Sequence, residues 1–164
     1  FLAGVVGYQY GDDVYIPNVI LDNAEKNVTQ PKIGERAVRY DVSTIQIEAN
    51  KSTESYTENI AQYLDGKKIT IRTKAAPTTK GKEQRIFDRA PDIRAHFIFL
   101  DDGHRTKEYT MFMQNVFSFK ITGKNKHDDA PDVLSMAAEF AFRNSDNRVS
   151  VFKRPFWFVK ILRF

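Results

Sequence analysis

The fold class is decided by "VSTIQIEANKSTESYTENIAQYLDG", residues 42 to 66, where the spacing of apolar residues changes midway. The first eight residues alternate with the period of two that is typical of a β-strand. Ile45 and Ile47 fall on the apolar face of this strand, and Glu48 falls on the other face. After Ser and Thr residues that can cap a helix, the apolar spacing becomes four, which predicts a helix that stops at Gly66. A strand followed at once by a helix indicates an α/β protein.

The same alternation continues on both sides of this stretch. Gly11, Asp12 and Asp13 form a turn signal between two β-rich segments, which predicts an opening hairpin. Strands that alternate with helices after a hairpin imply a mixed sheet with helices on its faces. The predicted strands cover residues 1–9, 14–21, 42–49, 68–73 and 96–100. The predicted helices begin near Asn27 or Thr29 and near Ser52 or Thr53, and cover 82–89, 107–116 and 129–142. The inner stripe is predicted to contain Ile33, Ala37, Val38 and Tyr40 in the first helix, and Tyr109, Phe112, Met113 and Val116 in the helix 107–116.

Length and composition exclude several classes of protein. The chain has 164 residues, enough for one domain with a real core, and 41% of them are hydrophobic. It has no Cys, which excludes disulfides and cysteine-based zinc sites. No apolar run approaches the length of a membrane span, and residues 1–6 are too short for a signal peptide. The net charge of +4 mildly favours a polyanionic partner.

The stretch "KHDDAPDVLSMAAEF", residues 126 to 140, places three carboxylates at the beginning of an apolar helix. Asp129 lies four residues before Val133, so we expect it on the inward stripe of this helix, with Asp132 near the same face. That stripe is predicted to comprise Val133, Met136, Ala137 and Phe140. Two interpretations are open. Asp129 and Asp132 bind a metal, or Asp129 caps the helix, Asp128 is solvated and Asp132 complements the helix dipole.

The position of Glu48 favours the metal-binding interpretation. It ends a strand with an apolar face, and sites in open α/β sheets form outside the carboxyl ends of strands. Oxygen ligands without Cys suit Mg²⁺ or Mn²⁺ rather than zinc. Two such ions about 3.5–4 Å apart can activate water and stabilise the leaving oxygen in phosphodiester cleavage. A basic rim would then bind the substrate phosphates, although a charge cluster is more often a solvated face. The candidates are Lys74, Lys80, Lys82, Arg85 and Arg89 in one group, and Lys120, Lys124 and Lys126 in another.

Three segments in this order resemble one family. "VSTIQIEANKSTESYTENI", "TKAAPTTKGKEQRI" and "GKNKHDDAPDVLSMAAEF" are similar to motifs of the C-terminal nuclease domain of tailed-bacteriophage terminase large subunits. The resemblance implies an RNase H-like α/β fold, a mixed β-sheet flanked by helices on both faces. It also implies two-metal cleavage of double-stranded concatemeric viral DNA during genome packaging, in the host cell cytoplasm. The implied partners are DNA, a terminase ATPase domain in the same polypeptide, the portal or procapsid, and the small terminase subunit.

The resemblance assigns roles to individual residues. Glu48, Asp129 and Asp132 match the family's catalytic acids and metal ligands. Asp128 is expected to lie beside these ligands and to contribute to metal binding. The DNA-binding residues are expected among Lys74, Lys80, Lys82, Arg85, Lys124 and Lys126. The family's first acid lies on a strand that is expected before Phe1. No G-x-x-x-x-G-K-[ST] occurs, so this chain carries no P-loop ATPase.

The predicted organisation is a nuclease domain over residues 1–143 and a basic-aromatic tail over 144–164. An alternative for this tail is that its strand-like residues 156–164 occupy a vacant position in the sheet. Two alternative functions also stay open. One is an RNase H-like junction resolvase, and the other is a non-catalytic domain that docks onto a portal or capsid through the tail.

Overall fold

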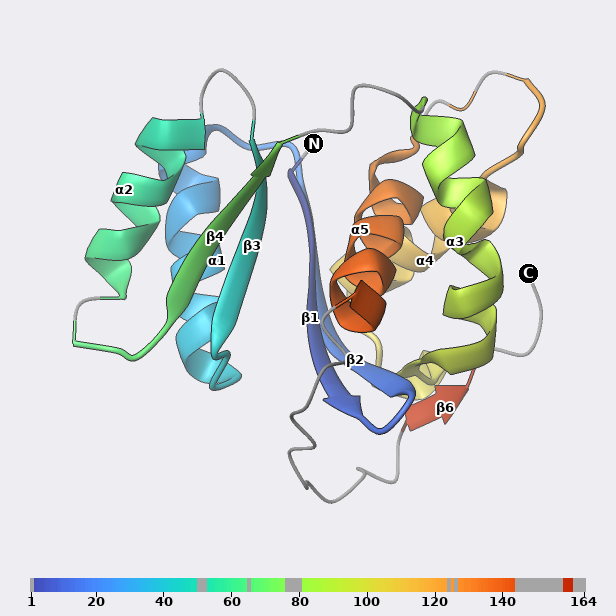
Figure 1. Cartoon of the computed structure of the whole chain (residues 1–164), viewed down its shortest axis with the longest axis horizontal. Coiled ribbons are helices and arrows are strands. Elements are labelled where there is room, and N and C mark those ends of the chain that lie inside the picture. The colour runs from blue at the N-terminus through green and yellow to red at the C-terminus, as the bar shows by residue number, and fades with distance from the viewer. Residues whose placement is uncertain are drawn as a thin grey trace. The chain divides into compact units, whose positions relative to one another are not determined.

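The computed structural model describes residues 2–49, 53–64, 66–75, 81–123, 125, 127–143 and 158–160. These residues form a mixed α/β structure with five α-helices and two small sheets (Figure 1). The chain divides into two compact units. The first unit comprises Phe1–Leu21 and Lys80–Phe164, and the second comprises Asp22–Thr79. Each unit has its own hydrophobic core.

The sheet of the first unit begins with the hairpin that the sequence predicts. β1 (Leu2–Tyr10) and β2 (Asp13–Asp22) meet at Gly11, whose φ of +58° is a left-handed conformation that favours glycine. β2 then pairs in parallel with β5 (Phe97–Leu100), so that hairpin and parallel pairing combine in one mixed sheet. The alternation read from the sequence is therefore confirmed at the level of a mixed α/β fold.

The C-terminal tail contributes a strand to this sheet. β6 (Phe158–Lys160) pairs antiparallel with β5, which gives the strand order β1-β2-β5-β6. This confirms the interpretation in which strand-like residues of the tail occupy a position in the sheet. The hydrogen-bonding edge of a short strand such as β5 is a favourable place for this addition.

Three α-helices complete the first unit, and α5 lies at their centre. α5 packs against α3, against α4 and against β1. The inward stripe of α4 is confirmed, because the residues buried on it are Tyr109, Phe112, Met113 and Val116. The helices are α3 (Lys82–His96), α4 (Lys107–Ser118) and α5 (Asp129–Arg143), with a short 3-10 helix η1 (Asp102–His104) before α4.

The stripe predicted for α5 is wrong, because the helix buries a different set of residues. The residues that are buried in the core are Ala130, Leu134, Ala138 and Ala141. Val133 and Ala137 are only half-buried at the margin of this core. The reason is close packing: a helix in contact with two other helices and a strand needs small side chains where these elements approach. Asp129 therefore does not lie on the buried face of α5.

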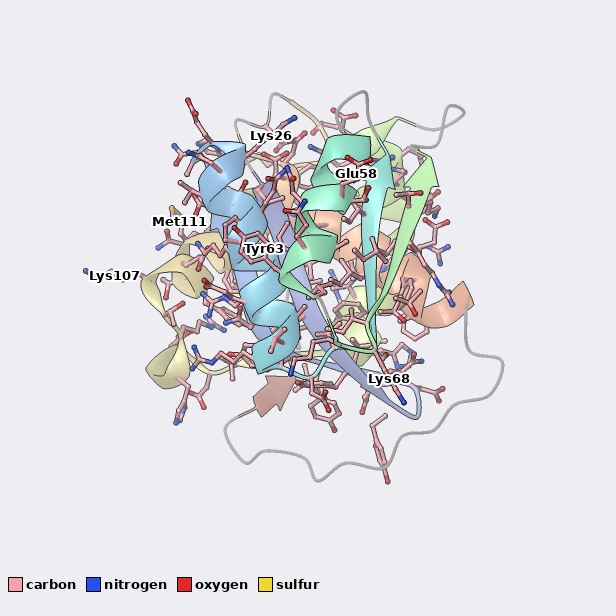
Figure 2. The ribbon with its side chains drawn as sticks, turned by 90° about the vertical axis from the view of Figure 1, so that its left-hand side faces the viewer. Lys26, Glu58, Tyr63, Lys68, Lys107 and Met111 are labelled. Carbon is pink, nitrogen blue, oxygen red and sulfur yellow. The ribbon has the colours of Figure 1, made fainter. Side chains whose placement is uncertain are left out.

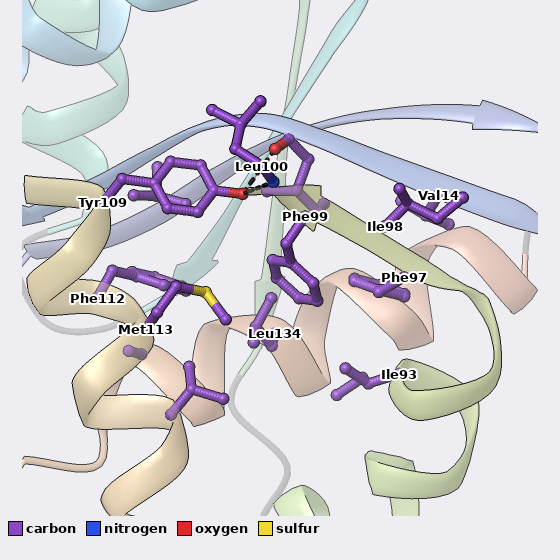
Figure 3. Close-up of a cluster of buried hydrophobic side chains, with 14 of the residues drawn as sticks. Val14, Ile93, Phe97, Ile98, Phe99, Leu100, Tyr109, Phe112, Met113 and Leu134 are labelled. Atoms are coloured by element: carbon purple, nitrogen blue, oxygen red, sulfur yellow. Dashed lines mark hydrogen bonds between the residues drawn. The ribbon is translucent and has the colours of Figure 1, made fainter. Parts of the chain in front are cut away.

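Aromatic side chains fill the core of the first unit (Figure 3). Phe97 and Phe99 of β5 are fully buried, and their ring centroids lie 6.2 Å apart. The phenol of Tyr109 donates a hydrogen bond to the carbonyl of Ile16 at 2.8 Å and accepts one from the N–H of Leu100 at 3.2 Å. Burial raises the pKa of the Tyr109 phenol, so the hydroxyl stays protonated and ties α4 to both β2 and β5.

The second unit consists of two helix–strand pairs. α1 (Lys26–Arg39) precedes β3 (Thr44–Ala49), and α2 (Thr53–Tyr63) precedes β4 (Thr70–Ala75). β3 and β4 form a parallel two-stranded sheet. The core of this unit contains Ala37, Ile60 and Leu64, and the partly buried side chains packed against it are Ile33, Val42, Ile45, Ile47, Ile69 and Ile71.

Two predictions about α1 are wrong. The residue at its N-cap position is Glu25 rather than Asn27 or Thr29. Thr29 instead lies buried within the helix, and its hydroxyl donates a hydrogen bond to the carbonyl of Glu25 at 3.2 Å. Val38, which the sequence placed on the inner stripe, is 39% exposed. The buried face is set by α2, whose Tyr63 lies so close to α1 that a Cβ added at Gly34 would come 2.7 Å from the Tyr63 Cβ (Figure 2).

Candidate metal centre

The acidic cluster comprises Asp128, Asp129 and Asp132 at the N-terminal end of α5. Asp128 precedes the helix, and its carbonyl accepts the first helical hydrogen bond from the N–H of Asp132 at 3.1 Å. Asp128 thus occupies the position that one interpretation of the sequence gave to Asp129. Pro131 follows within the first turn, where its missing N–H has no helical partner to lose. All three carboxylates benefit from the positive end of the helix dipole.

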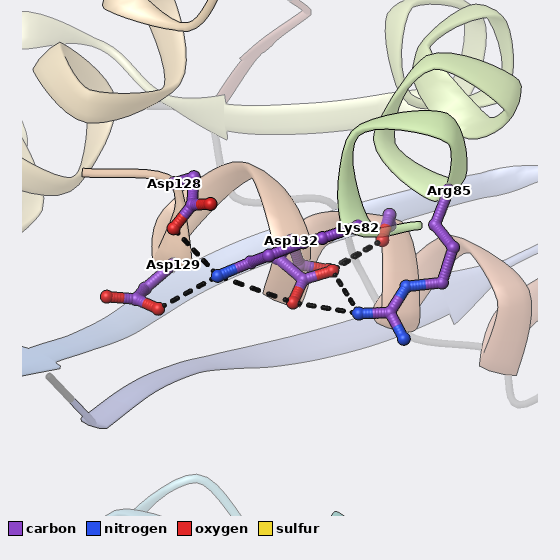
Figure 4. Close-up of polar contacts among 6 residues, drawn as sticks. Lys82, Arg85, Asp128, Asp129 and Asp132 are labelled. Atoms are coloured by element: carbon purple, nitrogen blue, oxygen red, sulfur yellow. Dashed lines mark hydrogen bonds and ion pairs between the residues drawn. The ribbon is translucent and has the colours of Figure 1, made fainter. Parts of the chain in front are cut away.

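The ammonium group of Lys82, the first residue of α3, lies among these carboxylates (Figure 4). Its Nζ is 2.7 Å from Oδ1 of Asp128 and 3.1 Å from Oδ1 of Asp129. Oδ2 of Asp132 lies 3.7 Å away from the same nitrogen. Three carboxylates from one helix end therefore converge on a single positive charge from another helix.

Arg85 joins the cluster one turn further along α3. Its Nη2 donates to both carboxylate oxygens of Asp132, at 2.9 and 3.1 Å. The hydroxyl of Ser135 donates to the backbone carbonyl of Asp132 at 2.7 Å. The side chains of Arg85 and Asp132 are only 15% and 11% exposed, whereas those of Asp128 and Asp129 are 29% and 36% exposed. The cluster thus has a buried part around Asp132 and a solvent-facing part around Asp128 and Asp129.

The neighbouring carboxylates keep Lys82 positively charged. Burial alone would lower the pKa of its ammonium, but the hydrogen bonds to Asp128 and Asp129 and the charges of Asp129 and Asp132 outweigh this effect and raise the pKa. Lys82 therefore stays protonated under ordinary conditions. In this state its positive charge offsets the repulsion among the three carboxylates.

The oxygen atoms of the cluster fit a hard divalent cation in their chemistry. Three carboxylate oxygens lie within 3.7 Å of one positively charged atom, and carboxylates are the ligands that Mg²⁺ and Mn²⁺ prefer. In the arrangement seen here these oxygens contact the ammonium of Lys82. Within the part of the chain that the structure describes, no group of three or more His, Cys, Asp or Glu side chains, this cluster included, is arranged to hold a metal ion.

Glu48 lies on β3 in the second unit. In the parallel register it stands opposite Lys74 of β4, so these two residues fall on the same face of the two-stranded sheet. The strand that the sequence predicts for Glu48 is confirmed. The role of Glu48 as a catalytic acid and metal ligand stays a prediction.

The residues predicted to bind DNA are found in several different settings. Lys82 and Arg85 contact the acidic cluster, and Arg89 forms an ion pair with Asp92 at 3.1 Å. Lys74 is half-buried on β4. Lys80, Lys124 and Lys126 lie outside the described residues, and the binding of phosphates by any of these side chains stays a prediction.

Sequence reasoning missed the contact between Lys82 and the acids. One signal could have found it. Lys82 and Arg85 are three positions apart on a helix, which places both on one face, and three carboxylates crowd the beginning of another helix. The complementary charges of two such helix ends predict that they meet.

The chain was compared with known families and proteins. No family model matches it, and no curated protein matches it either. None of the helices in the described residues has both the length and the apolar character required to cross a membrane.

Proposed function

We propose that this chain is a metal-dependent endonuclease of the terminase type, which cleaves double-stranded concatemeric viral DNA by hydrolysis of phosphodiester bonds. The observation that carries the proposal is the convergence of Asp128, Asp129 and Asp132 on one positive charge, the ammonium of Lys82. The mixed α/β fold and the three segments that resemble the family support it. An RNase H-like arrangement of the complete sheet is part of the same proposal.

The metal would be held by Asp129 and Asp132, with Asp128 beside them and Glu48 as the further ligand that the resemblance implies. Bound Mg²⁺ or Mn²⁺, in one or two copies, supplies activation of water and stabilisation of the leaving oxygen. The residues of the chain prepare this site. Arg85 orients Asp132 through two hydrogen bonds, and the carboxylates lie at the positive end of the α5 dipole.

The other components of the proposal come from the resemblance. The DNA backbone is bound by basic side chains among Lys74, Lys80, Lys124 and Lys126, with Lys82 and Arg85 close to the acids. The ATPase domain of the same polypeptide, the small terminase subunit and the portal or procapsid are the partners. The activity takes place in the host cytoplasm during viral assembly.

Substitution of Asp129 by Asn tests the metal-ligand role. We expect Asp129→Asn to abolish Mn²⁺-dependent cleavage of linear duplex DNA, because the amide removes the charge while nearly preserving the shape. The protein assayed should contain the further acid that the resemblance implies. Mn²⁺ should also raise the melting temperature of the parent protein, and raise that of the variant less.

The control is Asp12→Asn, which makes the same change at an exposed position of the hairpin turn. It should leave both cleavage and the metal-dependent shift in melting temperature unchanged. Parental cleavage by Asp129→Asn would contradict the proposal. A preference for four-way junctions over linear duplex would favour the junction resolvase instead.

A second candidate, the non-catalytic docking domain, has one specific observation in its favour. Lys82 and Arg85 already pair with the three carboxylates, so the cluster is held together without any metal. As a purely structural connection between α3 and α5, it would show neither Mn²⁺-dependent cleavage nor a metal-dependent melting temperature.

A further inference from the structure

The two strands of the second unit present two chemically different faces. Successive residues of a strand point to opposite faces of its sheet, so the parallel register of β3 and β4 sorts their side chains into two sets. One set packs against the core of the unit, where α2 contacts both strands, and its apolar members are Ile45, Ile47 and Ile71. The other set is polar throughout and comprises Thr44, Gln46, Glu48, Thr70, Arg72 and Lys74.

A hydrophilic face is unusual for parallel strands. Such strands are normally covered on both faces and therefore consist of nearly continuous apolar residues. In β4 the polar positions alternate regularly with the apolar ones, and both Thr70 and Arg72 are exposed. This face is therefore suited to a polar partner rather than to a further apolar layer.

The charges on the polar face are only partly balanced within the unit. Lys74 stands opposite Glu48 in the register, so these two charges offset each other. Arg72 stands opposite the neutral Gln46, and it forms no ion pair with any residue that the structure describes. Lys68 adds an exposed positive charge just before β4 begins (Figure 2). The face thus carries an excess of positive charge, centred on Arg72.

The arrangement of these groups fits a chain of phosphates. Arg72 and Lys74 are two positions apart on one strand, which separates them by about 6.6 Å. One strand of DNA carries a charge for about every 3.4 Å of its axis, so this spacing is close to that of every second phosphate. A guanidinium can bind two phosphate oxygens at once, and neighbouring hydroxyl and amide groups such as those of Thr70 and Gln46 also bind phosphates.

We propose that the polar face of β3 and β4 is a docking surface for the DNA backbone and that Arg72 contacts a phosphate there. This inference rests on the proposed function, because it takes the anionic partner to be DNA. Arg72 lies outside the set of DNA-binding residues predicted from the sequence. Phosphate contacts of this kind position the duplex without reading its bases, so the surface binds DNA of any sequence.

The test is the salt dependence of binding to a linear duplex, measured by fluorescence anisotropy with a chelator present so that no cleavage occurs. Arg72→Gln should lower the slope of log affinity against log salt concentration by about one. At a salt concentration of about 0.1 M this corresponds to binding that is about eightfold weaker. Duplexes of different sequence should lose affinity equally, and Arg72→Lys, which keeps the charge, should retain the parental slope.

The matched control is Arg39→Gln, which removes the same charge from the same unit. Arg39 is an exposed residue in the last turn of α1, where its guanidinium lies 5.8 Å from the centroid of the Tyr40 ring. This helix packs against α2 and contributes Ala37 to the core on the apolar side of the sheet. The slope for Arg39→Gln should equal that of the parent protein, and circular dichroism should show that both variants are folded.

The outcomes separate this inference from the proposed function. A parental slope in Arg72→Gln, with clear DNA binding by the parent protein, would overturn the docking surface and leave the proposed nuclease intact. The same fall in slope in Arg39→Gln would show an effect of net charge alone and would also overturn the surface. A fall in slope only in Arg72→Gln, without Mn²⁺-dependent cleavage by the parent protein, would support the surface and contradict the nuclease. An absence of DNA binding by the parent protein would overturn both.

Discussion

Asp129 and Asp132 show how neighbouring side chains of one type acquire different roles. Both lie in the first turn of α5, yet the Asp132 side chain is 11% exposed and bonded to Arg85, whereas that of Asp129 is 36% exposed. A half-exposed carboxylate can change its partner at little cost, while a buried one that loses its partner is strongly destabilised. Asp132 therefore anchors the cluster, and Asp129 is the carboxylate that can change its partner.

Substitution of Tyr109 tests how much a single buried hydroxyl contributes to stability. Tyr109→Phe should lower the free energy of unfolding by about 1–3 kcal/mol, because the carbonyl of Ile16 and the N–H of Leu100 lose a buried partner. Urea denaturation measures this change. Tyr63→Phe removes the same group from a side chain that is 52% exposed and should change the stability little. An equal effect of the two substitutions would contradict the role given to the buried hydroxyl.

Helices are positioned by close contacts that their intrinsic preferences do not reveal. In the second unit, α1 and α2 pack against each other at Gly34 and Tyr63. Alanine is the better helix former by about 1 kcal/mol, so propensity alone favours a replacement of Gly34 by Ala. The distance of 2.7 Å from the added Cβ to the Tyr63 Cβ excludes this replacement without a shift of the helices.

We therefore expect Gly34→Ala to destabilise the protein by about 1–3 kcal/mol, the range typical of an overpacked core. Thermal unfolding followed by circular dichroism measures the effect. Glu35→Ala places the same side chain at the next, exposed position of α1 and should be close to neutral or slightly stabilising. A stabilised Gly34→Ala variant would show that α1 and α2 can separate at no cost.

The molecule as a whole consists of two compact units with separate cores, so conditions can affect their stabilities separately. Asp22 is the first residue of the second unit. Its carboxylate accepts a hydrogen bond from the N–H of Ala24 at 2.9 Å and pairs with Lys32 at 3.0 Å. The hydrogen bond from Ala24 and the contact with Lys32 hold the pKa of Asp22 below its ordinary value.

A lowered carboxylate pKa stabilises the folded state at pH values above the pKa of the unfolded chain. This contribution disappears as the pH falls through the folded-state pKa. Asp22→Asn should therefore be less stable than the parent protein at neutral pH, and the difference should vanish in strong acid. Thermal unfolding at a series of pH values measures the difference. Glu58→Gln, at an exposed position of α2, should show a much smaller dependence on pH. A difference for Asp22→Asn that does not change with pH would contradict this account.

The kind and order of most elements could be predicted from the sequence, because they depend on local periodicity and turn residues. The hairpin at Gly11, the strand ending near Glu48 and the stripe of α4 all follow from patterns within a few neighbouring residues. It also located the acidic cluster, because its three carboxylates are close along the chain.

The contacts between these elements could not be predicted in the same way. The buried face of α5 depends on which elements pack against it, and so the actual stripe contains Ala130 and Leu134 rather than Val133. The partner of the acids is Lys82, 46 positions before Asp128; complementary charge could suggest this contact, but the local periodicity that predicts helices and strands does not specify it. Such contacts arise because burial and charge are satisfied between helices distant in the sequence, and those helices are brought together only by the packing of the whole unit.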